Sequence, residues 1–337
     1  MAYKRSNGKL RRRKMEPAVK TLLFNTDVAT TSTPTESYID LSQVASLVNR
    51  RFYRQGINWV VGGFKILSPV SGSIIISKLP DTWVMHNAWA KGFAAWDRMN
   101  KQALAENESI RPRFLDFKIY ADAVHHSKGF GANLLPRTVN AGGTSPATVG
   151  EWEASKIVTP QTTFSPGQAT SLEIIATGAN NPGPGNSGLD AKSLIEGYAA
   201  SRALPAVVDP NTPNDASVDA ENWMMSLFND GTKQDSYVID DMVSENNIAP
   251  YPFEDDGTNL DTMYPGGANQ LSGMQLHDMA LVTTSTVGGT TYMKGGEFPC
   301  GLIKIEHIVT QDSGNLAIQI DLVPGTHRGY MCEPMGA

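Results

Sequence analysis

The chain has little cysteine, no long hydrophobic run and no apolar leader. Its two cysteines, Cys300 and Cys332, are too few for a disulfide framework and lack the spacing of metal ligands, so we interpret them as ordinary thiols. The most apolar stretches, such as 73–77, are far shorter than the roughly 20 residues that span a bilayer. A secretory signal would need an apolar segment after the charged N-terminus. We therefore expect a protein made in the cytosol, with no membrane partner.

The sequence also lacks the signatures of common enzymes. It contains no G-x-x-x-x-G-K-[ST] phosphate loop, no H-E-x-x-H zinc motif and no G-x-S-x-G nucleophile elbow. The glycine-rich stretch 183–188 is too rich in proline to open a helix over a phosphate. We therefore predict no catalytic residues and no enzymatic activity.

Acidic residues are absent from the first 14 positions, which carry seven positive side chains. The remaining 21 basic and 34 acidic residues give the rest of the chain a net charge of −13. This charge split predicts that an N-terminal arm binds a polyanion while the acidic body has another role. The predicted nucleic-acid-binding residues of the arm are Lys4, Arg5, Lys9, Arg11, Arg12, Arg13 and Lys14.

Binding of the arm to one nucleic-acid strand would depend strongly on salt. If all seven charges contact phosphates, log affinity falls against log salt with a slope of about −5, because about 0.7 counterions leave per contact. The arm has almost no apolar residue, so we expect it to be disordered until it binds. Two other interpretations stay open: a solvated tail, and a nuclear-import signal at 9–14 that a receptor would recognise.

Period-two alternation of apolar and polar residues predicts most of the fold. The pattern is clearest at 303–309 and 316–322, which we expect to pair as a hairpin through a turn at 312–315. Another strand is expected at 115–123. The further predicted strands are 20–29, 58–67, 72–79, 151–158, 171–177 and 276–286.

One long helix is predicted at 82–105, with Asp81 as its N-cap. Trp89, Phe93 and Trp96 are spaced to share one face of this helix. Such an aromatic stripe could be a ligand platform, but packing against a sheet is the favoured interpretation.

Many short strands with one long helix in a connection predict an all-β fold, an eight-stranded jelly-roll β-sandwich. The glycine- and proline-rich region 178–275 is expected to form surface loops or a small insertion, with short helices at 190–202 and 219–228. The predicted divisions are a basic arm at 1–17, a jelly-roll domain at 18–325 and a C-terminal tail at 326–337.

Three arginines beside two aromatic residues form a second candidate nucleic-acid site. Arg50, Arg51 and Arg54 could hold phosphates while a base stacks on Phe52 or Tyr53. A solvated strand edge or a subunit contact is the alternative.

Metal binding is predicted only weakly. His125 and His126 are expected on a strand, where neighbouring side chains point to opposite faces and cannot bind one ion, so no metal site is predicted there. The acidic clusters at 254–256 and, less strongly, 240–241 could bind Ca²⁺ between subunits, because hard cations favour clustered carboxylates. A solvated acidic loop is the favoured interpretation of these clusters, so no cofactor is predicted.

Four short segments resemble capsid proteins of Rep-encoding circular single-stranded DNA viruses, in the smacovirus-like and pecovirus-like groups. They are WVVGGFKILSP at 59–69, KLPDTW at 78–83, NAWAK at 87–91 and RFLDFK at 113–118. The likeness lies within 59–136. It implies a coat protein that assembles with copies of itself into an icosahedral shell around single-stranded DNA. The arm would point inward, and the protein would occupy the host nucleus or cytoplasm before it enters the virion.

Two functional hypotheses follow. In the first, a homo-oligomeric shell packages single-stranded nucleic acid, and the loops of 178–275 face outward to meet a host surface receptor. In the second, a stand-alone carbohydrate-binding module or hydrolase carries a basic targeting tail. A sequence-specific DNA regulator is disfavoured because no helix-turn-helix, zinc finger or basic zipper is apparent. Assembly into uniform particles would separate the first hypothesis from the second.

Overall fold

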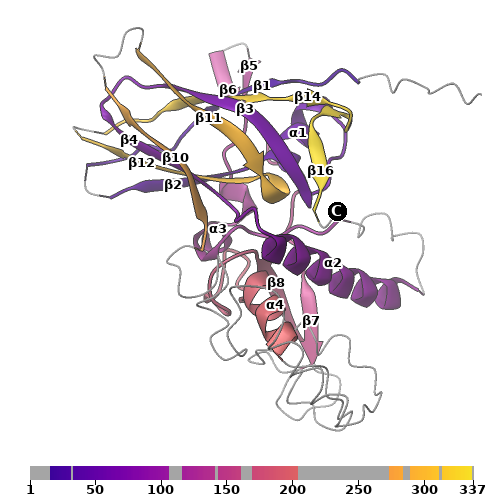
Figure 1. The fold of residues 1–337 in the computed structure, drawn as a ribbon. Coiled ribbons are helices and arrows are strands. Elements are labelled where there is room, and N and C mark those ends of the chain that lie inside the picture. Colours follow the sequence, from indigo (N-terminus) through magenta and orange to yellow (C-terminus); the bar gives the residue numbers. More distant parts are fainter. Residues whose placement is uncertain are drawn as a thin grey trace, which may run out of the picture.

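The computed structural model describes residues 16–31, 33–105, 116–140, 143–160, 169–203, 273–283, 289–310 and 313–335. Over these residues most regular structure is β-strand in antiparallel sheets, and helices are few (Figure 1). The expected all-β sandwich is therefore confirmed. The basic residues at 4–14, the predicted helix at 219–228 and the acidic clusters at 240–241 and 254–256 lie outside the described residues.

Two antiparallel sheets form the sandwich. The first has the order β1 (Thr21–Asn25), β13 (Ala317–Leu322), β3 (Ile57–Leu67) and β11 (Thr290–Phe298), and β16 (Cys332–Pro334) also pairs with β3. The second has the order β10 (Gln275–Val282), β4 (Gly72–Lys78), β12 (Leu302–Val309) and β2 (Thr35–Asp40). Strands predicted at 20–29, 58–67, 72–79 and 276–286 correspond to β1, β3, β4 and β10.

Alternation along the strands places one hydrophobic core between the sheets. β13 buries Ile318, Ile320 and Leu322 and leaves the residues between them partly exposed. The same core contains Trp59 and Phe64 of β3. Each fully buried side chain of this size contributes about 1.5–3 kcal/mol to folding. The core therefore fixes which face of each strand points inward.

The connection from β4 to β10 builds a second layer beside the sandwich (Figure 1). α2 (Trp83–Leu104) packs against α4 (Leu194–Ala203), so the short helix predicted at 190–202 is present. A small sheet accompanies them, made of β7 (Ile157–Pro160), β8 (Ala169–Ile175) and β9 (Ala191–Ser193). The remaining elements are α1 (Leu41–Asn49), α3 (Ala123–Lys128), β5 (Arg137–Asn140), β6 (Gly143–Pro146), β14 (Pro324–Gly325), β15 (Gly329–Tyr330) and the turns η2 (Phe130–Ala132) and η5 (Pro299–Gly301).

The long helix is confirmed, but its cap differs from the prediction. The Thr82 hydroxyl accepts from Met85 N at 3.3 Å, which makes Thr82 the N-cap of α2. Asp81 instead contacts His86 Nε2 at 3.0 Å. Thr82 adopts the extended backbone conformation of an N-cap directly before the first turn.

The aromatic stripe of α2 is a packing surface. The rings of Trp89, Phe93 and Trp96 all lie within 5.9 Å of the Phe117 ring, centroid to centroid. Trp89 and Phe93 also stack with centroids 5.2 Å apart. The favoured interpretation, packing inside the protein, is therefore confirmed, because Trp89 and Trp96 share a hydrophobic cluster with Phe117 and with Leu172 and Ile174 of β8.

The predicted hairpin of 303–309 and 316–322 is wrong. Both strands exist, as β12 and β13, but β12 pairs with β2 and β4 in one sheet, and β13 pairs with β1 and β3 in the other. The two strands therefore lie in different sheets of the sandwich. Period-two alternation identifies the buried face of a strand but carries no information about its partner.

The strands predicted at 115–123 and 151–158 are also largely wrong. Residues 116–119 are extended without ladder partners, and Tyr120 makes only an isolated bridge to Ile175. The Asp122 carboxylate then caps α3 by accepting from His125 N at 2.8 Å. In the second stretch β7 begins only at Ile157. In the first segment, Phe117 and Ile119 are apolar because they are buried beside α2 and β8, and not because the segment belongs to a regular sheet.

The segment predicted as a C-terminal tail is attached to the sandwich over its described part. β16 pairs with β3, and the Tyr330 ring lies in the main core beside Trp59. The sandwich and its hydrophobic core therefore include residues beyond 325.

A buried charge cluster joins the second layer to the sandwich. Lys304 Nζ on β12 lies 2.8 Å from Glu36, 2.9 Å from Glu306 and 3.5 Å from Asp122. Burial alone would lower the pKa of Lys304, but the three carboxylates outweigh it and raise the pKa. Tyr38 completes the junction by donating its hydroxyl to Asp122 at 2.7 Å. These contacts fix the second layer to the face of β2 and β12 that points away from the main core.

Candidate nucleic-acid interface

The basic arm joins the described chain at Glu16, beside the end of α1. Glu16 Oε2 lies 2.6 Å from Arg51 Nη1, and Val19 N donates to Asn49 Oδ1 at 3.0 Å. On the other side, the backbone of Gly329 passes so close that a Cβ there would lie 2.8 Å from the Glu16 carbonyl oxygen. The arm therefore starts from a defined point on the sandwich, between α1 and the turn before β15.

The loop that follows α1 presents the three predicted arginines to solvent. Arg50 ends the helix in a left-handed conformation, with φ 53° and ψ 35°, which turns the chain away from the helix axis. Arg50, Arg51 and Arg54 are all exposed. Through the Arg51–Glu16 ion pair, the loop that carries these three cations adjoins the point where the arm joins the body.

The two aromatic residues of this loop have different environments. Tyr53 is fully buried, with its ring 5.8 Å from that of Trp59 and 5.6 Å from that of Tyr330. This burial removes Tyr53 as a stacking surface. Phe52 is 46% exposed, and its ring centroid lies 6.2 Å from that of Trp152. Phe52 is therefore the aromatic side chain of the loop that a base can reach.

A lysine from a distant part of the chain lies against these rings. Lys118 Nζ is 4.4 Å from the centroid of the Trp152 ring and 5.8 Å from that of Phe52, within the range of cation–π attraction. Sequence reasoning missed Lys118 and Trp152 as members of this surface. Neither residue neighbours the arginine loop in sequence, and only the tertiary fold brings them to it.

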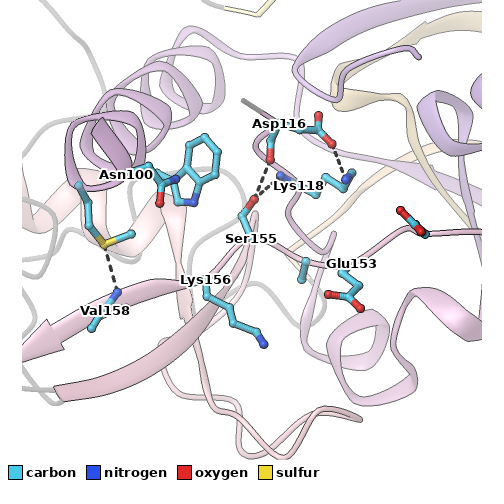
Figure 2. Close-up of a pocket in the computed structure, with 11 residues that line it drawn as sticks. Asn100, Asp116, Lys118, Glu153, Ser155, Lys156 and Val158 are labelled. Atoms are coloured by element: carbon cyan, nitrogen blue, oxygen red, sulfur yellow. Dashed lines mark hydrogen bonds and ion pairs between the residues drawn. The ribbon is translucent and has the colours of Figure 1, made fainter. Parts of the chain in front are cut away.

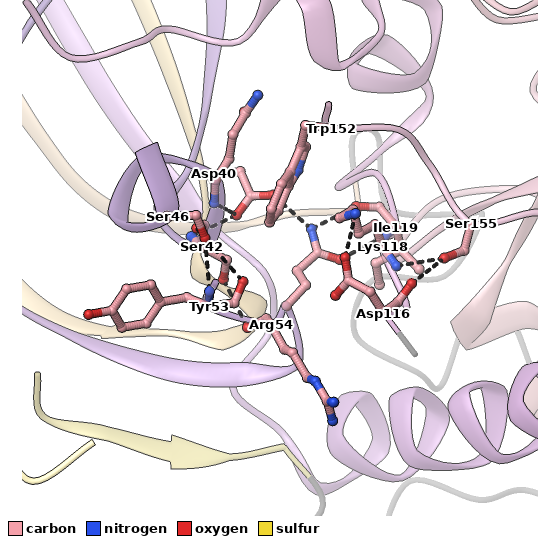
Figure 3. Close-up of polar contacts among 12 residues, drawn as sticks. Asp40, Ser42, Ser46, Tyr53, Arg54, Asp116, Lys118, Ile119, Trp152 and Ser155 are labelled. Atoms are coloured by element: carbon pink, nitrogen blue, oxygen red, sulfur yellow. Dashed lines mark hydrogen bonds and ion pairs between the residues drawn. The ribbon is translucent and has the colours of Figure 1, made fainter. Parts of the chain in front are cut away.

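A buried hydrogen-bond network holds this surface in place (Figure 3). Gln55 accepts from Ile119 N at 2.7 Å and donates to Asp40 Oδ2 at 3.1 Å, and Trp152 Nε1 donates to the same oxygen at 3.0 Å. Asp40 Oδ1 caps α1 by accepting two backbone N–H groups at 2.9 and 3.3 Å. Burial raises the pKa of Asp40 to about 7, although these hydrogen bonds oppose the shift. The network ties α1, the arginine loop and Trp152 into one unit.

Two cavities flank the segment 116–118. The larger, of about 720 Å³, is lined by α2, by Glu151 and by residues 153–156, and it contains the Asp116–Lys118 ion pair (Figure 2). Burial raises the pKa of Asp116, and contact with Lys118 opposes the shift. Ser155 Oγ holds this segment by accepting from Lys118 N at 2.9 Å and donating to Asp116 O at 3.1 Å. The smaller cavity, of about 560 Å³, is lined by Phe52 and Arg54.

His125 and His126 lie on helix α3, so the strand geometry expected for them is wrong. His125 Nδ1 accepts from Ala121 N at 3.0 Å, and its Nε2 contacts Asn133 Oδ1 at 2.8 Å. His126 Nε2 instead contacts Glu173 Oε2 at 2.8 Å. The two rings therefore bind different partners. Among the described residues, no three His, Cys, Asp or Glu side chains are grouped closely enough to hold a metal ion.

Comparisons of the chain with models of protein families, with curated proteins and with solved structures found no match. In the part of the chain that the structure describes, no helix is long and apolar enough to cross a membrane.

Proposed function

We propose that this chain is a viral capsid protein that assembles into an icosahedral shell and packages single-stranded DNA through its basic N-terminal arm. The observation that carries the proposal is the attachment of the seven-charge arm beside the exposed arginines of a two-sheet sandwich. The arm would face the packaged strand, and the acidic body would form the shell in the virion.

The order of the strands supports a jelly roll as the shell-forming unit. Within the residues that the structure describes, eight strands make up the two main sheets when β16 is set aside. If these eight strands are counted in chain order, β1, β13, β3 and β11 are the first, eighth, third and sixth, and they form one sheet. In the same count β10, β4, β12 and β2 are the fifth, fourth, seventh and second, and they form the other sheet. Strands that alternate between two sheets in this way describe the double Greek key of the jelly roll, the fold of many capsid subunits. Fold alone does not establish function, so the arm is needed for the argument.

An exposed apolar edge supports self-assembly. β10 and β11 are edge strands of the two sheets and lie next to each other. Met279 and Leu281 of β10 are 61% and 75% exposed, and Tyr292 of β11 is 74% exposed. An unpaired edge with apolar side chains is a template for another chain. We assign a second copy of this chain as its occupant, because a closed shell needs self-complementary or head-to-tail contacts at its edges.

Electron microscopy of the purified full-length protein tests assembly. Uniform particles of many subunits are the expected result, whereas a monomer that persists at high concentration would contradict the proposal. Deletion of residues 1–14 tests the role of the arm, and absorbance at 260 and 280 nm measures the nucleic acid that co-purifies. We expect the deletion to remove the nucleic acid and to leave the circular-dichroism spectrum of the body unchanged. DNase and RNase digestion of the extracted cargo distinguishes DNA from RNA.

A further inference from the structure

A groove of about 560 Å³ opens beside the start of the arm. Its polar rim is formed by Arg54, His327 and Arg328, and its apolar walls include Phe52, Trp89 and Phe93. Figure 3 shows the Arg54 side chain extending away from the Asp40 network toward α2, the helix that supplies two of the aromatic residues. The groove therefore combines cations and flat aromatic rings in one place.

Several polar groups of the groove are available to a ligand. The Arg54 guanidinium makes no hydrogen bond or ion pair with the residues that the structure describes, although the charge of Asp116 is near enough to interact with it. Arg328 uses one nitrogen to donate to the Phe52 carbonyl, which leaves the other donors of its guanidinium. Arg54 and Arg328 are both exposed, so their free donors can hold an anionic acceptor such as a phosphate.

We propose that this groove binds one unstacked nucleotide of the packaged strand, with its base against the Phe52 ring and its phosphate held by Arg54 and Arg328. The inference rests on the proposed packaging function and adds a site in the body of the protein. Base stacking on an aromatic ring tolerates every base, and an arginine fork matches a phosphate. The groove therefore binds single-stranded nucleic acid without sequence preference.

The position of the arm favours a nucleic-acid strand over an acidic peptide as the occupant. Arg328 directly precedes Gly329, and the backbone of Gly329 packs against Glu16, the residue at which the arm joins the body. A strand held by the arm is therefore kept at high local concentration near the groove. His327 is largely neutral near pH 7, because burial and the charge of Arg328 lower its pKa, so it suits an uncharged base edge rather than a carboxylate.

Fluorescence anisotropy of full-length protein, stripped of its cargo, with a labelled oligo(dT) of six nucleotides tests the proposal. The same titration uses an abasic oligonucleotide of equal length and charge. At raised salt, where the arm contributes least, we expect wild-type protein to bind oligo(dT) at least about fivefold more tightly than the abasic strand, as stacking of one base predicts. Phe52→Ala should lose this preference and bind both strands equally.

A matched control and the salt dependence separate the two parts of the site. Val139→Ala removes another exposed apolar side chain, on β5 and not on the proposed subunit edge of β10 and β11, and should keep the preference for bases. Arg54→Ala should keep the preference but reduce the salt slope by about 0.7, the effect of one lost phosphate contact on a single strand. Circular dichroism confirms that each variant is folded.

Failure of the groove is distinguishable from failure of the packaging function. If wild-type protein binds neither strand at low salt, the packaging proposal itself is contradicted. If it binds both strands equally, or if Phe52→Ala keeps the preference for bases, the arm can still package nucleic acid but the groove is not a nucleotide site. Competition by a poly-glutamate peptide as strong as that by oligo(dT) would also overturn the inference, because it would show a site for charge alone.

Discussion

Acidification should destabilise this protein through His125, a histidine that the fold keeps neutral. Its Nδ1 accepts from Ala121 N at 3.0 Å, and its Nε2 contacts Asn133 Oδ1 at 2.8 Å, so the neutral ring with its proton on Nε2 satisfies both neighbours. Protonation of Nδ1 would turn an accepted hydrogen bond into a clash of two donors. Burial is the main cause that lowers the pKa of His125 from 6.5 to about 3, and the charges of His126 and Lys128 add to it.

The size of the effect follows from the pKa difference. Between pH 6.5 and about 3 the unfolded chain binds a proton at this position and the folded protein does not. The stability that depends on neutral His125 is therefore present above pH 6.5 and is lost as the pH falls below it. At about 1.4 kcal/mol per pH unit, the loss from pH 6.5 to 5 is about 2 kcal/mol.

Urea unfolding of unassembled protein at pH 7, 6 and 5 measures this loss. His125→Gln removes the titration, so its free energy of unfolding should decline less than that of wild type over this range, by about 2 kcal/mol. The quantity to compare is the change in the free energy of unfolding between pH 7 and pH 5, because the substitution also changes stability at pH 7. His86→Gln is the control, since His86 lies at the surface of α2 beside Asp81. Parallel decline of wild type and His125→Gln would refute the reasoning.

Two further substitutions test other parts of the structure. Asp40→Ala should lower the free energy of unfolding by about 3 kcal/mol in urea titrations, because α1 loses its N-cap and the buried Trp152 N–H loses its acceptor. The control, Asp81→Ala, should lower it by under about 1 kcal/mol. Equal effects of the two substitutions would contradict the role assigned to the Asp40 network. Leu281→Asp, at a side chain that is 75% exposed, should leave the fold intact but reduce the yield of particles in light scattering and electron microscopy; unchanged assembly would exclude the β10 edge as a subunit contact.

Local patterns were enough to predict the elements whose signals lie within one segment. The long helix, the strands β3, β4 and β13, and the packing role of the α2 aromatics follow from spacing alone. The signals failed where two causes produce the same pattern. Phe117 and Ile119 are buried in the hydrophobic cluster beside α2, yet residues 116–123 form an isolated bridge and the start of α3 instead of a strand.

The candidate site divides in the same way. Arg50, Arg51 and Arg54 were predicted because they neighbour one another in sequence, and the structure places them on one exposed surface. Lys118 and Arg328 reach that surface from distant segments and carry no local signal. Tyr53, equivalent to Phe52 by pattern, is buried because its side chain turns inward against Trp59.

The charge split between arm and body, the predominance of strands and the inward face of the regular strands all follow from the amino-acid sequence, because each depends on composition or on the period of a single element. Only the tertiary structure decided that β12 and β13 lie in different sheets, that the arm starts beside the arginine loop, and that a groove opens there. The reason is physical: sheet pairing and surface clusters arise from contacts between residues far apart in the chain, whose energies no local window contains.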